Sequence, residues 1–552
     1  MKKILGFIIV LALSYWMVRP LFGPGYFPMH DDTQVARVVE MGRALREGQF
    51  PVRWVSDLGY GYGYPIFNFY GPLPYYAGGF FYALGLTGLT ATKLMMGLGL
   101  VLAGATMYFT VAEIAGVSGG ILAAAFYMYA PYHAVDAYVR GAVGEYWALI
   151  FVPLIFLGIW RLVHGKATTG LLIGAAGIAG LITSHTILGY TGMIFVAVAA
   201  LITGIWQAKR RNWQTVRSLI MLVLLGVGLS AFFWLPALSE MKYTNVASQI
   251  SATADYHDHF VCLPQLWNSA WGYGGSAKGC LDGFSFKVGK EHLVIAFIAL
   301  LGVVVGIIRE RRARRFILAG MGILLLSIFF TLPVSQKIWE TLPLFAYVQY
   351  PWRFLAFAIF GVSLVTAGVT YLLRQKYVRW GIVVLSIAIL LFIEIKRFAT
   401  QYTYVRPPDS FESAVDIEFR ASKISDEYLP AAIPRPVNST DIVRDTIRSS
   451  EDYTLKIVQN TDTYKKFEFL SGMQNQVKVN VAYFPGWTYM VNEFTVKPPL
   501  SDGLPILTVP AGLTVVQMRF SDTPMRTAGN VISVICLCLW LYIYDKRKKT
   551  IG

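Results

Sequence analysis

Charged residues are scarce in this chain of 552 residues, where Asp, Glu, Lys and Arg make up 14% and hydrophobic residues make up 55%. This balance excludes an ordinary water-soluble domain, which needs more charge to cover its surface. Apolar windows of about 20 residues, the length that crosses a bilayer, recur from Ile4 to Phe398 and again from Ala528 to Tyr544. Because these runs lack the alternation of barrel strands, the sequence predicts a polytopic α-helical membrane protein.

Several chemical motifs are also missing. The chain has no Walker A motif, no G-x-G-x-x-G fingerprint and no H-E-x-x-H motif, so nucleotide hydrolysis is not expected to drive it. Cysteine is rare, with four residues and no Cys-x-x-Cys pair, which argues against structural zinc. Cys262 and Cys280 share one polar loop, and we predict a disulfide that closes about 18 residues and stabilises the fold by about 3 kcal/mol.

The basic residues outnumber the acidic ones and give a formal charge of +16. They gather in short loops beside hydrophobic spans, at 209–211, 309–315, 374–379 and 546–549. The positive-inside rule assigns such loops to the cytoplasm. By contrast, residues 399–526 hold 13 Lys and Arg against 15 Asp and Glu. Nucleic acid is therefore not an expected partner, and the bilayer is.

The charge pattern also predicts the topology and the domains. Both termini are expected in the cytoplasm, with Met1 to Lys3 opening a retained first span rather than a cleaved signal. A transmembrane domain covers 1–398, with exterior loops at 23–90 and 239–290. An exterior β-rich domain of sandwich type, with short alternating segments, covers 399–526, and 527–552 form a last span with a basic tail.

One apolar segment conflicts with this topology. The parity of the loops fails if both Pro72 to Leu86 and Thr92 to Glu113 cross the membrane. The first is short and begins Pro-Leu-Pro, so we interpret it as an interfacial or re-entrant helix. About 12 full crossings then remain, counted at about 20 residues each.

The first exterior loop contains His30-Asp31-Asp32 directly after the first span. Acidic pairs at membrane depth are costly and usually functional. Asp31 and Asp32 could raise one another's pKa, bind a divalent cation or accept a proton from an attacking hydroxyl. Alternatively, one of them could serve as the N-cap of a helix over Val35 to Arg46.

The same loop continues with a glycine and tyrosine run that includes Tyr60, Tyr62 and Tyr64. Glycine permits tight turns over a ligand, and sugars stack on aromatic rings. We therefore expect a substrate groove formed by these tyrosines and His30. An aromatic belt at the membrane surface is the alternative explanation.

Further charged candidates fall on the same predicted side. Glu145 could be a second acidic site, or it could simply pair with Arg140. His185 could bind a metal or phosphate, or it could be a structural histidine. Arg353 opens a span on the exterior, against the charge trend, and a phosphate would satisfy its guanidinium. Snorkelling toward the membrane surface is the alternative for Arg353.

Five short motifs occur together and in order along the chain. They are His30-Asp31-Asp32, Gly61-Tyr62-Gly63-Tyr64-Pro65, Pro351-Trp352-Arg353-Phe354, Glu427-Tyr428-Leu429-Pro430 and Tyr483-Phe484-Pro485-Gly486-Trp487. With the exterior acidic loop and C-terminal β-domain, the chain resembles the GT-C superfamily of polytopic glycosyltransferases. Within it, the chain is similar to YfhO-like bacterial proteins and to membrane proteins labelled 6-pyruvoyl-tetrahydropterin synthase-related. Pterin chemistry itself needs a histidine zinc site that the sequence lacks.

The resemblance implies a membrane glycosyltransferase of the bacterial plasma membrane. The donor would be a polyprenyl-phosphate or polyprenyl-diphosphate sugar, and the acceptor an envelope glycan, lipid or protein on the exterior face. Asp31 or Asp32 would act as the base, with Arg353, Arg140 and His185 near the phosphate. A divalent metal such as Mg or Mn, where one is used, would be held by Asp31, Asp32 and Glu145. A transporter or flippase of lipid-linked substrates and a non-catalytic assembly factor are the alternative functions.

Overall fold

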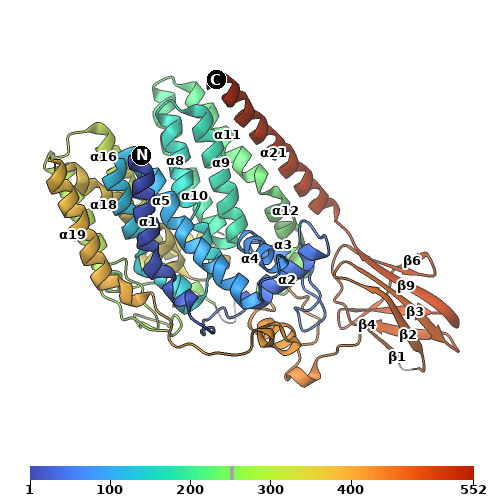
Figure 1. Cartoon of the computed structure of the whole chain (residues 1–552). Helices are drawn as coiled ribbons and strands as arrows, with labels where there is room; N and C mark the ends of the chain where they lie inside the picture. Colours follow the sequence, from blue (N-terminus) through green and yellow to red (C-terminus); the bar gives the residue numbers. More distant parts are fainter. Residues whose placement is uncertain (249–253, 343, 374, 450, 552) are drawn as a thin grey trace.

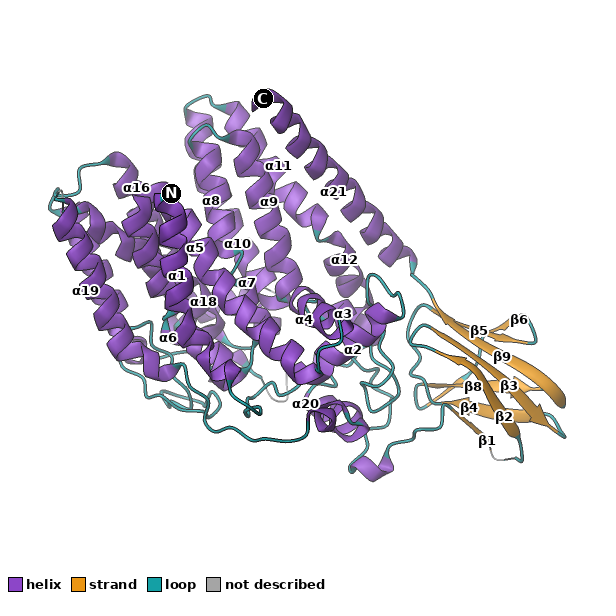
Figure 2. Cartoon of the chain, in the orientation of Figure 1, coloured by secondary structure: helices purple, strands orange, loops and turns teal. Residues whose placement is uncertain are grey.

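The computed structural model describes residues 1–248, 254–342, 344–373, 375–449 and 451–551, with the backbone alone for 548–551, as a helical bundle with a β-domain beside it (Figures 1 and 2). Arg374 and the side chains of Lys548 and Lys549, which belong to predicted basic loops, lie outside the described part, as do residues 249–253 of the predicted 239–290 loop. The described fold is a polytopic helical membrane protein with a C-terminal β-domain, as the sequence predicts.

Twelve helices make up the bundle within the described residues. They are α1 (Lys2–Val18), α5 (Gly88–Met128), α8 (Val152–Val163), α9 (Ala167–Ser184), α10 (Thr186–Lys209), α11 (Trp213–Leu229), α12 (Ala231–Glu240), α15 (Lys290–Val304), α16 (Arg311–Thr331), α18 (Leu355–Thr366), α19 (Lys376–Glu394) and α21 (Pro524–Ile551). Small residues bring neighbouring helices close: a Cβ on Gly158 of α8 would lie 2.5 Å from the Cα of Gly174 in α9. Such contacts replace the hydrophobic effect as the packing force in lipid.

Eight further helices lie mainly in the segments between those of the bundle. They are α2 (Gln34–Arg46), α3 (Ile66–Phe69), α4 (Leu73–Ala83), α6 (Pro131–Val135), α7 (Val143–Ala148), α14 (Leu263–Trp267), α17 (Gln336–Thr341) and α20 (Ser422–Ile424). With 11 residues, α4 is about 16 Å long and too short to cross a bilayer. It packs on α2, which agrees with the interfacial helix that the parity argument predicts.

The number of crossings depends on how three elements are counted. Nine helices of the described chain are long and apolar enough to cross a membrane, and the bent pair Trp213–Leu229 with Ala231–Tyr243 would make ten. The long α5 is itself bent at Gly116, where φ is 77°. A Cβ on Gly120 would lie 2.7 Å from the Cβ of Ala112, so α5 folds back on itself. Counting both arms of α5 and the short α15 gives the expected total of about twelve.

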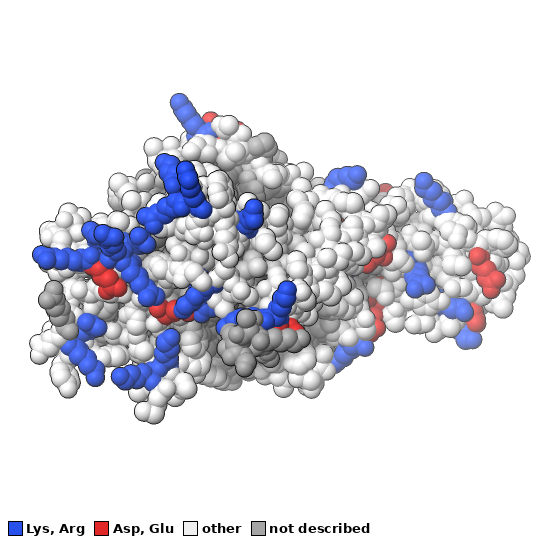
Figure 3. Space-filling model, turned by 90° about the horizontal axis from the view of Figure 1, so that it is seen from above, with Lys and Arg blue, Asp and Glu red and all other residues white. Residues whose placement is uncertain are grey.

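Basic residues gather at the end of the bundle that carries both termini (Figures 1 and 3). The exposed arginines there include Arg210, Arg211, Arg311 and Arg314. Glu113, next to the bend of α5, is paired at this end with Arg161 and with Lys166. We call this the terminal end. The opposite end contains the cavity that is described below, and we call it the cavity end.

The β-domain consists of two antiparallel sheets. The strands are β1 (Ile447–Ser449), β2 (Thr454–Asn460), β3 (Tyr464–Ser471), β4 (Asn475–Val479), β5 (Trp487–Val491), β6 (Phe494–Val496), β7 (Leu500–Ser501), β8 (Leu504–Val509) and β9 (Gly512–Phe520). Their order is β1-β4-β8-β7 in one sheet and β2-β3-β9-β5-β6 in the other. Alternate side chains such as Phe467, Val477 and Val516 are buried, as in a sandwich core.

Residues 399–446, predicted as part of the β-rich domain, instead form loops and short helical turns. We call this segment the strap. It is fixed to the cavity end of the bundle, where Glu412 accepts hydrogen bonds from the Gly88 amide at 2.7 Å and from the Tyr82 hydroxyl at 2.9 Å. The first strand of the two sheets begins only at Ile447, and within the strap Tyr404 forms one isolated antiparallel bridge, with Tyr26 of the first loop.

A buried ion pair joins the β-domain, α21 and α12. Arg526 donates to Glu240 at 2.8 and 3.1 Å and to the Pro485 carbonyl oxygen at 2.9 Å. Glu240 also accepts from Asn68 at 2.8 Å and from Thr523 at 2.6 Å. This ion pair therefore connects α3, the bundle and the β-domain.

We expect Glu240→Gln to destabilise the whole protein. The change leaves the fully buried Arg526 guanidinium without its carboxylate, which costs on the order of 3–5 kcal/mol. Thermal unfolding of the purified protein in nanodiscs should show a lower melting temperature, and protease should cut the strap faster. Glu468→Gln is the control: Glu468 pairs with the exposed Lys456, and such pairs contribute about 0–1 kcal/mol. Equal melting temperatures for the two variants would contradict the prediction.

Candidate functional site

A cavity of about 460 Å³ opens at the cavity end of the bundle. Its walls come from the loop after α1, the α9–α10 turn, α12, residues 344–353 and the strap. The charged side chains and the histidine that line it are Asp31, Arg37, Glu145, His185, Arg353 and Glu427. Segments about 400 residues apart in sequence thus meet around one space.

Glu145 is the anchor of this site. Its carboxylate has no exposed surface and accepts from Arg140 at 2.7 and 2.8 Å, from Arg353 at 3.0 Å and from the Tyr132 hydroxyl at 3.0 Å. Arg140 also pairs with Asp136 at 2.6 Å. Two guanidinium groups and two carboxylates therefore neutralise one another, which a buried position requires.

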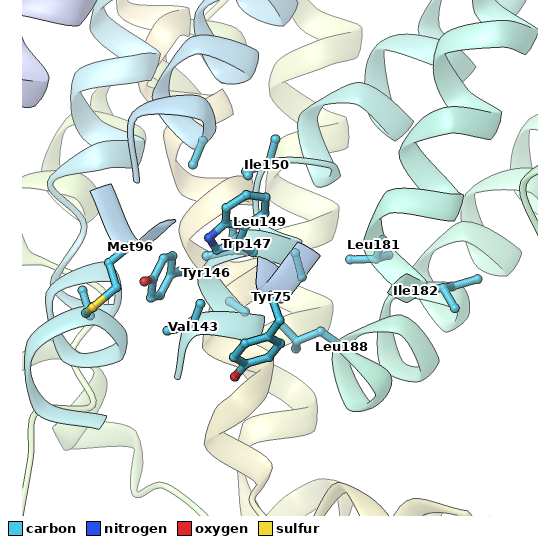
Figure 4. Packing of buried hydrophobic residues seen from close by; sticks show 14 of the residues in the cluster. Tyr75, Met96, Val143, Tyr146, Trp147, Leu149, Ile150, Leu181, Ile182 and Leu188 are labelled. Carbon is cyan, nitrogen blue, oxygen red and sulfur yellow. The ribbon is translucent and has the colours of Figure 1, made fainter. Parts of the chain in front are cut away.

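The short helix α7 holds Glu145 in place by packing. Figure 4 shows Tyr146 and Trp147 of α7 among buried side chains that include Met96 and Leu188. The Trp147 ring nitrogen also donates to the Met95 carbonyl oxygen at 3.1 Å. Because its neighbours are locked, Glu145 cannot swing out to act as a free acid.

The guanidinium of Arg353 has a hydrogen-bond donor that no described residue uses. Its Nε binds Glu145, and its Nη1 donates to the Val348 carbonyl oxygen at 2.6 Å and to Gln349 Oε1 at 3.1 Å. Gln349 has φ of 65°, a strained value for a residue other than glycine and typical of functional sites. Among the residues that the structure describes, none accepts from Nη2 of Arg353. This lone nitrogen suits a phosphate oxygen in the cavity.

The two neighbouring aspartates are in different environments. Asp31 lines the cavity, and its backbone amide donates to the Arg140 carbonyl oxygen at 2.9 Å. Asp32 instead approaches Arg420 of the strap at 3.6 Å, and burial raises its pKa although Arg420 and Arg406 oppose the shift. The N-cap of α2 is Thr33, so the alternative of an aspartate cap is wrong.

Arg37 of α2 brings a second guanidinium to the cavity. It donates to Tyr75 at 3.3 Å and to Ser425 of the strap at 2.8 Å, and it lies 4.1 Å from the Tyr70 ring centroid. Burial raises the pKa of the nearby Glu427, and the charge of Arg37 opposes that rise. The residues around Arg37 thus join α2 to the strap.

His185 occupies the turn between α9 and α10. Its Nδ1 accepts from the Leu188 amide at 3.1 Å and caps α10, so the neutral ring carries its proton on Nε2. Burial lowers the pKa of His185 to about 3, and Glu145 opposes this shift. His185 is therefore a neutral donor to the cavity at physiological pH.

Several predicted site residues lie elsewhere. Arg140 does not line the cavity, because Glu145 and Asp136 hold it behind the wall. Tyr60 and Tyr64 pack against the strap, where Tyr60 donates to Asp426 at 3.5 Å. The Tyr64 hydroxyl accepts from the Tyr428 amide at 3.2 Å.

The other two residues of the predicted groove are also outside this cavity. Tyr62 lines a smaller cavity beside the β-domain. His30 is exposed and contacts the Tyr273 carbonyl oxygen at 3.1 Å. The predicted disulfide between Cys262 and Cys280 is confirmed.

The expected metal ligands do not converge. Asp31 faces the cavity, Asp32 pairs with Arg420, and both oxygens of Glu145 are taken by arginines. The described part of the chain contains no group of three or more His, Cys, Asp or Glu side chains that could hold a metal ion. The proposed set of Asp31, Asp32 and Glu145 therefore does not fit a metal.

Other cavity residues escape prediction from sequence. Arg37 carries a weak signal, an arginine in the helix that follows the acidic motif. Ser425 and Glu427 carry none for this site, because nothing local indicates that the strap returns to the first loop. Glu427 does belong to one of the motifs that support the family resemblance.

The fold and site define a multi-pass membrane protein with a charged cavity at one end and a β-domain beside it. The chain belongs to the family described as bacterial membrane protein YfhO, whose model matches residues 53–410. An uncharacterized protein of Lactococcus lactis subsp. cremoris (strain MG1363) is 26% identical over 243 residues, which are 43% of this chain and 40% of that relative.

Two solved structures show weaker likeness. The arabinofuranosyltransferase AftD from mycobacteria matches 73% of this chain and 27% of its own, with 15% identity and a TM-score of 0.46. ArnT from Cupriavidus metallidurans, bound to undecaprenyl phosphate, matches 66% of this chain and 78% of its own, with 13% identity and a TM-score of 0.32. The chain thus spans less than a third of the length of AftD.

We expect the cavity end of the protein to unfold more readily in the Glu145→Gln variant. A neutral amide leaves Arg140 and Arg353 with an uncompensated buried charge, at a cost of about 3–5 kcal/mol. The melting temperature in nanodiscs should fall clearly below that of the wild type. Asp31→Asn is the matched control, because no ion pair of Asp31 exists among the described residues and its loss should leave the melting temperature nearly unchanged. Similar losses for both variants would show that Glu145 is not the anchor.

The lowered pKa of His185 predicts that the folded protein loses stability in acid. Its pKa falls from 6.5 to about 3 on folding, so the folded protein binds fewer protons between these values. The stability that neutral His185 contributes is complete above pH 6.5 and declines as the pH falls toward 3. In His185→Asn the asparagine keeps a helix cap but does not titrate. The melting temperature of this variant should therefore fall less than that of the wild type on acidification from about pH 7 to about pH 4. Parallel melting curves for both proteins across that range would refute the role.

Proposed function

We propose that this protein is a membrane glycosyltransferase that takes a sugar from a polyprenyl-phosphate or polyprenyl-diphosphate donor. The observation that carries the proposal is the meeting of Asp31, Arg37, His185 and Arg353 around one cavity at the end of a lipid-embedded bundle. A carboxylate opposite cationic and neutral donors is what a displacement at a sugar phosphate needs. The motif resemblance to the GT-C superfamily supports the same reaction class.

Asp31 is the proposed base. Unlike Asp32, it lines the cavity, and it forms no ion pair with a described residue. The carboxylate accepts the proton of the acceptor hydroxyl as the oxygen attacks C1 of the sugar. The bond from C1 to the phosphate oxygen breaks, and its electron pair leaves with the lipid phosphate. The product is an inverted glycoside, and Asp31 holds the proton.

Arg353, Arg37 and His185 are the proposed partners of the leaving phosphate. Arg353 can offer Nη2, and His185 can offer the Nε2 proton without adding charge. Arg37 lacks a carboxylate partner within 4.0 Å among the described residues, so its charge remains available to an anion. The charge that develops on the phosphate in the transition state would strengthen each of these bonds.

The orientation of the protein follows from its charges. The terminal end is basic and belongs in the cytoplasm by the positive-inside rule. We therefore place the cavity and β-domain on the exterior face of the plasma membrane, with an envelope glycan, lipid or protein as the acceptor.

The pair Asp31→Asn and Asp32→Asn tests the base. We expect Asp31→Asn to lower transfer by about 10²–10⁴-fold, since a general base typically contributes that much. Asp32→Asn should retain most activity because Asp32 faces the strap. Transfer would be measured in membranes with a radiolabelled polyprenyl-phosphate hexose, and envelope glycans by mass spectrometry.

Three outcomes separate the alternatives. Unchanged glycans in both variants, at normal protein levels, would refute the glycosyltransferase. Movement of the labelled lipid across the membrane of proteoliposomes, without transfer of its sugar, would indicate a flippase. Loss of function on deletion of the β-domain, with both aspartate variants active, would indicate an assembly factor.

A further inference from the structure

A second cavity, of about 160 Å³, lies where the first loop, the strap and the β-domain meet. We call it the junction cavity. Gly61, Tyr62 and Gly63 of the glycine and tyrosine run form one side, Glu418 and Arg444 of the strap another, and the β-domain contributes residues from β2, β3 and the segment after β4. It is separate from the cavity that contains Asp31, with which it shares no lining residue.

The lining of the junction cavity is polar, aromatic and balanced in charge. Trp54 and Tyr62 belong to its wall, although the Trp54 ring packs on Phe484, Trp487 and Phe520, and Asn460 and Asn480 contribute amides. The carboxylates of Asp57 and Glu418 are matched by the cations of Arg444 and Lys465. A cancelled charge does not select an ion, whereas amides, carboxylates and guanidinium groups bind hydroxyls from several directions.

Hydrogen bonds within the protein hold two parts of this lining in place. Lys465 donates to Asn460 at 2.6 Å and to the Thr461 carbonyl oxygen at 3.1 Å. The Tyr62 carbonyl oxygen accepts from the Ala482 amide at 2.8 Å, which fixes the turn against the β-domain. A preorganised polar lining lowers the cost of binding a ligand.

The strap forms a wall of both cavities. Ile424, Ser425 and Glu427 face the first cavity, and Glu418 faces the second. The Ser422 hydroxyl between them accepts from the amides of Gly59 and Tyr60 at 3.0 and 3.2 Å. The two cavities therefore share one wall segment, residues 418–427 of the strap.

We propose that the junction cavity binds one neutral sugar residue of a saccharide. Tyr62 in its wall, its many hydrogen-bonding side chains and its balanced charge together suit a pyranose. The further assignment of this saccharide to the acceptor rests on the proposed glycosyl transfer. Binding itself does not, because it depends on no residue of the first cavity.

The test measures saccharide binding to the full chain in nanodiscs. Glucose, galactose, N-acetylglucosamine and their short oligomers would be titrated by saturation-transfer difference NMR. We expect at least one of them to bind, and Arg444→Ala to weaken its binding at least about fivefold. Lys456→Ala is the matched control, because Lys456 is likewise an exposed cation paired with a glutamate but lies outside the cavity. It should leave binding within about twofold.

A second variant guards against misfolding. Glu418→Gln keeps the size of the side chain and should also weaken binding, with an unchanged melting temperature as proof of folding. No binding by any saccharide of the panel, or equal affinities for Arg444→Ala and Lys456→Ala, would overturn the proposal. Asp31→Asn should bind the saccharide like the wild type. Saccharide binding that depends on Arg444, combined with normal transfer by Asp31→Asn, would retain the subsite and refute the proposed base.

Discussion

Glu145 is buried, yet its carboxylate is shared by two arginines, and the rest of the site depends on that arrangement. A charge in the apolar interior is tolerated only when its partners satisfy it completely. Arg140 and Arg353 come from segments 213 positions apart, so satisfying Glu145 joins the end of one helical hairpin to the start of another span. Arg353 is thereby fixed with one nitrogen still available, and the wall of the cavity is formed.

The strap extends this arrangement into water. It contributes Ser425 and Glu427 to the cavity, Arg420 to Asp32, and Glu418 to the junction cavity. Polar loops bind through individual side chains and can follow an irregular surface, which a strand with its regular ladder cannot do. The β-domain then attaches to the bundle through Arg526 and Glu240. A displacement of the β-domain would therefore affect both cavities through one continuous segment.

Much of the fold could be predicted because lipid imposes simple rules. Spans follow from length and hydropathy, and the parity of basic loops identified α4 as a helix that does not cross. The disulfide of Cys262 and Cys280 followed from two cysteines in one loop. The span predicted over Thr92 to Glu113 ends three residues before the bend of α5 at Gly116, although the sequence did not single out that glycine.

The candidate site could be predicted only in part. Asp31, Glu145, His185 and Arg353 were identified because charges and histidines stand out among apolar residues, and all four line the cavity. The sequence alone could not separate Asp31 from Asp32, since adjacent residues share every local property. Nor could it assign Tyr62 to a second cavity, or bring Arg37 to Ser425.

By itself, the sequence determined that this protein lies in a membrane, which segments cross it and which residues carry unusual charge, because these depend on composition and local order. Only the tertiary structure decided which charges meet. Hydrogen bonds and ion pairs act over a few ångströms, and their partners come from helices, loops and a strap that the chain brings together only by folding. The sequence therefore predicted a membrane protein, but it did not predict the two cavities.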